Sequence, residues 1–138
     1  MSYTKLAQEL RVSVSTVHRR IKRLLKEDIV KITAIPNPAK VGYPAIAFIS
    51  MDVELAKIDE VCAKLVSYPN VNFVAVTFGR FDVIIHAHFA STELLSKFIK
   101  NVLSTVDGIV NIESLIMAEM KKRGYSYVLA DETTEGEL

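Results

Sequence analysis

Two short amphipathic segments separated by a tight turn constrain the beginning of this chain. The first covers about residues 3–10 and follows Ser2, a residue suited to cap a helix. The second covers about residues 14–26 and follows Ser13, another good N-cap. The apolar face of the first segment consists of Tyr3, Leu6, Ala7 and Leu10. This spacing predicts two helices joined by a three-residue turn, that is, a helix-turn-helix.

The second segment has one apolar and one polar side. At about 100° per residue its apolar stripe consists of Val14, Val17, Ile21, Leu24 and Leu25. Hydroxyl groups lie near its start and cations lie further along. In a helix that enters the DNA major groove, the early residues contact base edges and later cations contact phosphates. We therefore predict sequence-specific binding to double-stranded DNA through Ser13, Ser15, Thr16, His18, Arg19, Arg20, Lys22 and Arg23.

The charge is divided unevenly along the chain. Residues 1–40 hold nine Lys and Arg against three acids, whereas residues 41–138 hold eight bases against thirteen acids. Such asymmetry indicates that the first part meets a polyanion and the second does not.

Several classes of protein are disfavoured by the composition. The single cysteine, Cys62, excludes an internal disulfide, and no apolar run is long enough to span a bilayer. The start is polar and resembles no signal peptide, so we expect a cytoplasmic protein without a membrane partner. There is no nucleophile elbow, phosphate-binding glycine loop or metal-ligand spacing. We predict no enzyme, no catalytic residue, no metal and no cofactor. His86 and His88 share a strand face, but two ligands do not complete a metal site.

An internal repeat organises the second part of the chain. Its two halves predict strand 45–53, helix 55–67 and strand 71–78, and then strand 82–89, a helix capped by Ser91 or Thr92, and strand 109–120. The fold class is α+β, with a winged-helix-like helix-turn-helix and a ferredoxin-like βαββαβ domain. The expected ranges are 1–35 for the helix-turn-helix with a linking strand at 29–35, 36–44 for a hinge, 45–125 for the second domain and 126–138 for a tail.

One face of the predicted sheet has no helix to cover it. In strand 71–78, Val71, Phe73, Ala75 and Thr77 are expected on one side and Asn72, Val74, Val76 and Phe78 on the other. Both sides are mostly apolar, so both are expected to be buried. A second copy of the chain is the expected cover, which predicts a homodimer with sheets face to face.

The sequence resembles the Lrp/AsnC (feast/famine) regulators. The resemblance is carried by Leu6-Ala7, Val12-Ser13, Thr16-Val17, Arg20-Ile21 and Leu24, and then by residues 29–34, Asn37-Pro38 and residues 41–43. It implies dimers that assemble into tetramers or octamers. The family usually has glycine where Arg11 and Asp28 stand, which implies left-handed backbone at both positions. It also has a helix ahead of the one at Tyr3, so this chain is expected to lack the first helix of its DNA-binding domain.

The segment Gly79-Arg80-Phe81-Asp82 is, from its residues alone, a hairpin turn between two strands. The resemblance implies more, because the matching turn of the family helps to bind a small effector, usually an amino acid. Asp82 is then expected to meet an ammonium group. Ser114 is expected to face the same pocket, where Ile112 replaces a second hydroxyl of the family pattern.

Two alternatives remain open at the level of sequence. Siroheme decarboxylases resemble Lrp/AsnC proteins in both domains, and His86 and His88 keep that enzymatic hypothesis open. A sensing or co-assembly module without DNA binding is the other alternative.

Overall fold

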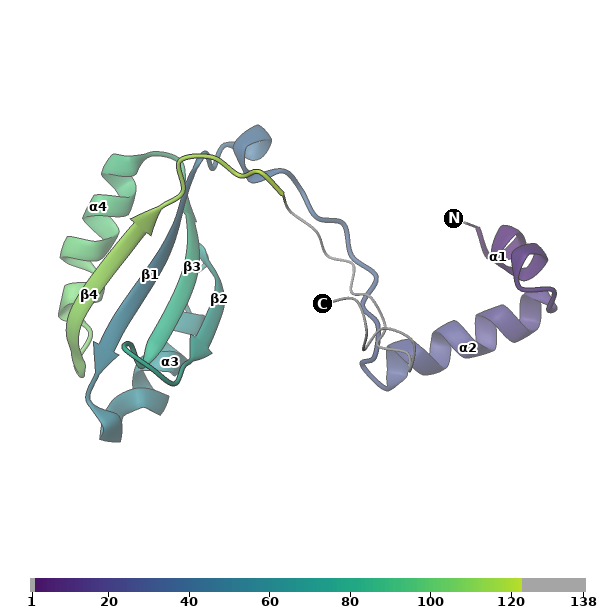
Figure 1. Ribbon diagram of the computed structural model, residues 1–138, viewed down its shortest axis with the longest axis horizontal. Helices are drawn as coiled ribbons and strands as arrows, with labels where there is room; N and C mark the ends of the chain where they lie inside the picture. Colours follow the sequence, from purple (N-terminus) through teal and green to yellow (C-terminus); the bar gives the residue numbers. More distant parts are fainter. Residues whose placement is uncertain (1, 123–138) are drawn as a thin grey trace, which may run out of the picture. The chain divides into compact units, whose positions relative to one another are not determined.

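The computed structural model describes residues 2–122, and the chain divides after Pro36 into two compact units (Figure 1). The prediction for a tail at 126–138 lies outside the described residues. Each unit is described by itself below.

The first unit contains the two predicted helices, α1 (Tyr3–Glu9) and α2 (Val14–Lys26). Both caps are confirmed: the Ser2 hydroxyl accepts a hydrogen bond from the backbone N–H of Lys5, and the Ser13 hydroxyl accepts one from Thr16. Each cap satisfies an N–H group that the helix itself cannot pair.

A residue with left-handed backbone conformation lies on either side of α2. Arg11, in the turn, has φ of 52°, and Asp28, just after the helix, has φ of 54°. This backbone costs a residue with a Cβ about 1–2 kcal/mol relative to the right-handed region. The left-handed conformation that the family resemblance implied at both positions is therefore confirmed.

The core of the first unit is small. Among its described residues only Ala7 and Val17 are buried, where α1 packs against α2. Val14, Leu24 and Leu25 of the apolar stripe remain exposed. These two helices alone therefore cover only part of the stripe.

The linking strand predicted at residues 29–35 is wrong. The segment forms neither helix nor strand, and all of its residues are exposed. An apolar alternation becomes a strand only when a neighbouring strand completes its hydrogen bonds. No described segment of the chain pairs with this one. Beyond it, the Asn37 side chain caps a short 3₁₀ helix, Pro38–Val41.

The second unit is a four-stranded antiparallel sheet with the order β2-β3-β1-β4. Its strands are β1 (Ala45–Val53), β2 (Val71–Val76), β3 (Val83–Phe89) and β4 (Ile109–Ile116). Two helices connect them, α3 (Ile58–Val66) after a 3₁₀ turn at Leu55–Lys57, and α4 (Thr92–Asn101) before a 3₁₀ turn at Leu103–Thr105. This element order and topology confirm the ferredoxin-like βαββαβ fold.

Both helices cover the same face of the sheet (Figure 1). On β1 the side chains of Ala47, Ile49 and Met51 are fully buried on this face, whereas Phe48 on the opposite face is exposed. Val61 and Leu65 of α3, and Leu95 and Phe98 of α4, complete the core. Burying each large side chain contributes about 1.5–3 kcal/mol, so the alternation along β1 fixes which face the helices occupy.

Several details of the strands differ from the prediction. β2 ends at Val76 rather than at Phe78, and β3 begins at Val83 rather than at Asp82. β4 ends at Ile116 rather than at Met120, because Ile116 pairs with Ala47 near the start of β1 and little partner strand remains beyond it. In β2 the register shifts between Val71 and Phe73. Val71 packs against the core while Phe73 is exposed and pairs with His86. The expectation that Val71 and Phe73 share a face is wrong because this β-bulge interrupts the alternation.

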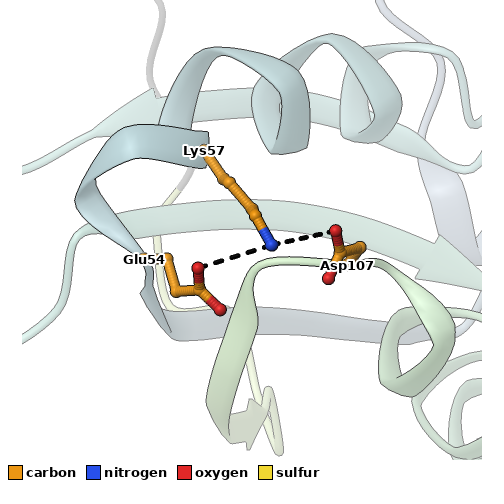
Figure 2. A network of polar contacts seen from close by, with 3 residues as sticks. All are labelled: Glu54, Lys57 and Asp107. Atoms are coloured by element: carbon orange, nitrogen blue, oxygen red, sulfur yellow. Dashed lines mark hydrogen bonds and ion pairs between the residues drawn. The ribbon is translucent and has the colours of Figure 1, made fainter.

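An ionic cluster joins the two helical crossovers at one end of the sheet (Figure 2). The Lys57 ammonium lies 2.9 Å from the Asp107 carboxylate and 3.4 Å from that of Glu54. The hydrogen bond from Lys57 lowers the pKa of Asp107, and the same bond is the main cause of the raised pKa of Lys57. Gly108 lies directly beneath Lys57: a Cβ there would be 2.8 Å from the Lys57 Cβ.

Candidate nucleic-acid interface and effector site

The start of α2 presents a group of hydroxyls. Besides capping the helix, the Ser13 Oγ lies 2.9 Å from the Ser15 Oγ and 2.8 Å from the Thr16 Oγ1. Ser13 is thus committed to the helix end, and Ser15 and Thr16 stand on the first turn beside it. This placement matches the part of a recognition helix that approaches base edges.

The cations of α2 fall into two groups. Arg19, Arg20 and Lys22 are exposed, and none of them forms an ion pair with a described residue. Arg23 instead donates from Nε to the Glu27 carboxylate at 2.8 Å, one turn further along. Lys26, in the last turn, is likewise exposed and forms no ion pair with a described residue. Four cations of α2 are therefore available to phosphates, whereas Arg23 would first have to leave Glu27.

His18 lies on the flank of α2 that faces α1. Its ring is 5.7 Å from the ring of Tyr3 in an edge-to-face arrangement. The side chain is exposed, so it can both support the packing of the two helices and contact a ligand.

The predicted effector turn lies between β2 and β3 and is tied to its neighbours at both ends. The backbone of Thr77 donates to the Asp82 carbonyl at 2.8 Å, and the Thr77 hydroxyl donates to the Phe81 carbonyl at 2.6 Å. The Asp82 carboxylate accepts a hydrogen bond from the backbone N–H of Val53 at 2.9 Å. Gly79 has φ of 143°, which side chains rarely tolerate. The turn is therefore rigidly held.

Arg80 connects this turn to the last strand. Its guanidinium lies 3.1 Å from the Glu113 carboxylate and stacks over the Phe81 ring at 4.9 Å. Within one chain the structure does not bring Ser114 to that contact. Ser114 pairs with Ile49 of the helix-covered face, and Glu113 pairs with Ser50 of the opposite face. Glu113 is the residue that sequence reasoning missed, and the β1–β4 register is the signal that finds it.

The two histidines of β3 lie on the sheet face that the helices leave open. Their ring centroids are 4.8 Å apart, and the His86 Nδ1 lies 2.7 Å from the Asn72 Oδ1. Among the described residues no group of three or more His, Cys, Asp and Glu side chains could hold a metal ion. No helix in residues 2–122 is long and apolar enough to cross a membrane.

Comparisons with known proteins agree with this geometry. A family model described as "Lrp/AsnC ligand binding domain" matches residues 46–127. A second family model, described as "HTH domain", matches residues 1–43. An uncharacterized HTH-type transcriptional regulator of Pyrococcus horikoshii is 35% identical over 129 residues, which cover 93% of this chain and 82% of the relative. The HTH-type transcriptional regulator FL11 of Pyrococcus furiosus is 34% identical over 109 residues, covering 78% of this chain and 72% of the relative.

Solved structures share the same fold. E. coli AsnC has a TM-score of 0.83 at 26% identity, with 90% of this chain and 85% of that chain covered. The feast or famine regulatory protein of M. tuberculosis, solved with L-methionine, has a TM-score of 0.83 at 22% identity, with coverage of 93% and 87%.

A helix-turn-helix unit followed by a βαββαβ ligand-binding domain defines an HTH-type transcriptional regulator, and the relatives are regulators rather than enzymes. The chain belongs to the Lrp/AsnC family.

Proposed function

We propose that this chain is a sequence-specific DNA-binding regulator that acts in the cytoplasm, dimerises through its second domain and senses a small effector such as an amino acid. The observation that carries the DNA-binding part is the exposed surface of α2. Arg19, Arg20 and Lys22 lie beyond a capped helix start that carries Ser15 and Thr16. Phosphates supply salt-dependent affinity to such cations, and hydroxyls at the start supply base contacts.

The open face of the sheet supports the homodimer. Phe48, Phe73 and Leu115 are apolar side chains on this face, and each is exposed in the single chain. A contiguous exposed apolar surface of this kind marks an interface. A two-fold dimer would also supply two recognition helices, as a pseudo-palindromic operator requires. Tetramers or octamers would use further surfaces of the dimer.

The turn between β2 and β3 supports the effector site. Gly79, Arg80, Phe81 and Asp82 would surround the effector; Ser114, which pairs with Ile49 of the helix-covered face, is not part of this proposal. In this proposal the Arg80 guanidinium, which one chain pairs with Glu113, exchanges that partner for the carboxylate of the amino acid. The M. tuberculosis relative solved with L-methionine makes amino acids the first effectors to test.

Fluorescence anisotropy tests DNA binding. Labelled DNA from upstream of the gene is titrated with the full chain, with and without a panel of amino acids including L-methionine. We expect binding that Arg19→Ala together with Arg20→Ala weakens strongly and that Lys40→Ala, in the 3₁₀ helix after the first unit, leaves nearly unchanged. No binding by the wild-type chain would leave the sensing module without DNA binding as the better hypothesis.

Size-exclusion chromatography and native mass spectrometry test the dimer. Phe48→Glu places a charge on the open face and is expected to give monomers. Leu55→Glu is the matched control, because Leu55 is also exposed but lies in the 3₁₀ turn before α3, away from that face. A dimer that persists in Phe48→Glu would show that the open face is not the interface.

A further inference from the structure

The helices α1 and α2 end in the same backbone structure. After α1, the Arg11 N–H donates to the Gln8 carbonyl at 3.3 Å and the Val12 N–H donates to the Ala7 carbonyl at 3.0 Å. After α2, the N–H groups of residues 28 and 29 donate to the carbonyls of residues 25 and 24 at the same two distances, 3.3 and 3.0 Å. This pair of bonds is the Schellman motif, which ends a helix with one residue in the left-handed region. The motif holds Arg11 and Asp28 there, with φ of 52° and 54°.

Local chemistry accounts for the aspartate but not for the arginine. A short polar side chain such as that of Asp can hydrogen-bond locally and tolerates left-handed backbone, which glycine adopts freely. Asp28 also lies 3.7 Å from the Lys31 ammonium. Arg11 has neither compensation, because its side chain is long and exposed and forms no ion pair with any residue of the described range 2–122. Such an outlier without a structural cause points to a functional position.

Arg11 lies close to the surface that carries the proposed DNA contacts. It precedes Ser13, the cap of α2, by two residues, so the Cα atoms of Arg11 and Ser13 are at most about 7.6 Å apart. The hydroxyls of Ser13, Ser15 and Thr16 gather at this end of the helix. Since Arg11 lies in the turn rather than on α2, its side chain flanks the helix that would enter the major groove. A guanidinium beside a groove-bound helix meets the DNA backbone, where it can donate two parallel hydrogen bonds to one phosphate.

We propose that Arg11 is an additional phosphate contact of this regulator, and that the two hydrogen bonds of the Schellman motif hold it in position for that contact. The inference rests on the proposed DNA binding and adds a residue outside the recognition helix. It extends the cationic surface of Arg19, Arg20 and Lys22 to the chain segment on the other side of the hydroxyl group cluster. Because phosphate contacts carry no sequence information, Arg11 strengthens binding to every duplex to the same degree.

Fluorescence anisotropy of the full chain tests the contact on two duplexes at low salt, the DNA upstream of the gene and a scrambled duplex of the same length and composition. Arg11→Gly, which suits the left-handed backbone, should weaken binding to both duplexes by about tenfold. It should also make the slope of log K against log salt concentration shallower by about 0.9. Arg11→Lys keeps the charge, so it should keep the wild-type slope and lose only part of the affinity.

Hydrogen exchange of the backbone amides of α1 and α2 separates this contact from a structural role. Arg11→Gly removes the strain at the end of α1, so we expect exchange in the first unit at the wild-type rate or slower. Asp28→Gly is the matched control, because it changes the same position of the other Schellman motif. It should keep the slow exchange and should not weaken DNA binding.

Several results would overturn the proposal. Equal affinity and salt slope in Arg11→Gly and wild type would show that the guanidinium does not touch the DNA. A loss restricted to the upstream duplex would indicate a base contact instead. A similar loss in Asp28→Gly, or faster exchange in Arg11→Gly, would assign the effect to the helix ends themselves.

The same titrations distinguish this inference from the proposed function on which it rests. DNA binding that Arg19→Ala weakens and Arg11→Gly leaves unchanged contradicts the role of Arg11 alone. No binding of either duplex by the wild-type chain contradicts both proposals.

Discussion

The Asp82 carboxylate and the Val53 backbone N–H form a hydrogen bond of 2.9 Å that fastens the β2–β3 turn to the end of β1. The β1–β4 register shifts between Asp52 and Val53, so Val53 lies at an irregularity of the ladder. The carboxylate satisfies the Val53 N–H at this point, and the Asp82 N–H in turn donates to the Met51 carbonyl. Asp82 therefore has a structural role besides the effector role that we propose for it.

Replacing Asp82 separates these two roles. Asp82→Ala leaves the partly buried Val53 N–H without its acceptor, and we expect the free energy of unfolding to fall by about 1–3 kcal/mol. Asp82→Asn keeps an oxygen at the same place and should retain most of the stability. Urea unfolding of the two variants measures the difference.

The effect of an amino-acid effector on DNA binding then tests the second role of Asp82, and Asp82→Asn is the informative variant. If Asp82 meets an ammonium group, Asp82→Asn should lose the response despite its near-normal stability. Equal responses of Asp82→Asn and wild type would contradict the proposed ammonium contact and leave the structural role alone.

The elements that sequence reasoning located correctly are those with a local cause. Ser2, Ser13 and Ser91 mark three helix starts because a serine cap needs only the next few residues. The bounds of β1 were also correct, since Ala45–Val53 lies at the centre of the sheet and its burial pattern is strong.

The wrong predictions concern residues whose secondary structure, sheet face or contacts depend on residues far away in the sequence. Residues 29–35 alternate like a strand but meet no strand in the described chain. The alternation of the sequence predicts Val71 and Phe73 on one face, because a bulge leaves no mark in composition. Glu113 contacts Arg80 only because β4 pairs with β1 in one particular register. A single sequence shows the elements more clearly than the register between them.

Gly42 and Gly108 have almost the same φ angle, so alanine variants of the two glycines can test the close packing of Gly108 against Lys57. Gly42 and Gly108 have φ of 93° and 95°, but an added Cβ meets nothing within 4 Å at Gly42 and meets the Lys57 Cβ at 2.8 Å at Gly108. Gly42→Ala should cost only the backbone strain, about 1–2 kcal/mol. Gly108→Ala should cost about 1–3 kcal/mol more.

Thermal unfolding of the two variants measures that difference. Equal losses would mean that α3 moves away from Gly108 at no cost, contrary to the close packing of Val61, the other neighbour of this glycine.

The ionic cluster of Figure 2 predicts a pH dependence of stability. The folded chain lowers the pKa of Asp107, so the unfolded chain binds more protons in acid and stability falls as the pH drops through the pKa range of this carboxyl group. The raised pKa of Lys57 acts at the other limit: its contribution is present at neutral pH and is lost as the pH rises through the folded pKa.

Asp107→Asn should remove part of the acid dependence. We expect a smaller difference between the melting temperatures at pH 7 and at about pH 3 than in the wild type. Asp59→Asn is the control, since Asp59 is exposed and forms no ion pair with a described residue. The difference in acid dependence between Asp107→Asn and the wild type should become smaller in high salt, because Asp107 is exposed and salt screens its interaction with Lys57. An unchanged acid dependence in Asp107→Asn would show that the cluster contributes nothing in solution.

The salt dependence of DNA binding tests which cations of α2 contact phosphate. Each phosphate contact contributes about 0.9 to the slope of log K against log salt concentration, so Arg19→Ala and Arg20→Ala should each make the slope shallower by about that amount. Arg23→Ala should change it less, because the guanidinium is already paired with Glu27 at 2.8 Å and must leave that partner to reach a phosphate. Anisotropy titrations over a range of salt concentrations give the slopes, and Arg80→Ala in the other domain should keep the wild-type value. Slopes that stay unchanged in both Arg19→Ala and Arg20→Ala would mean that this side of α2 does not face the DNA backbone.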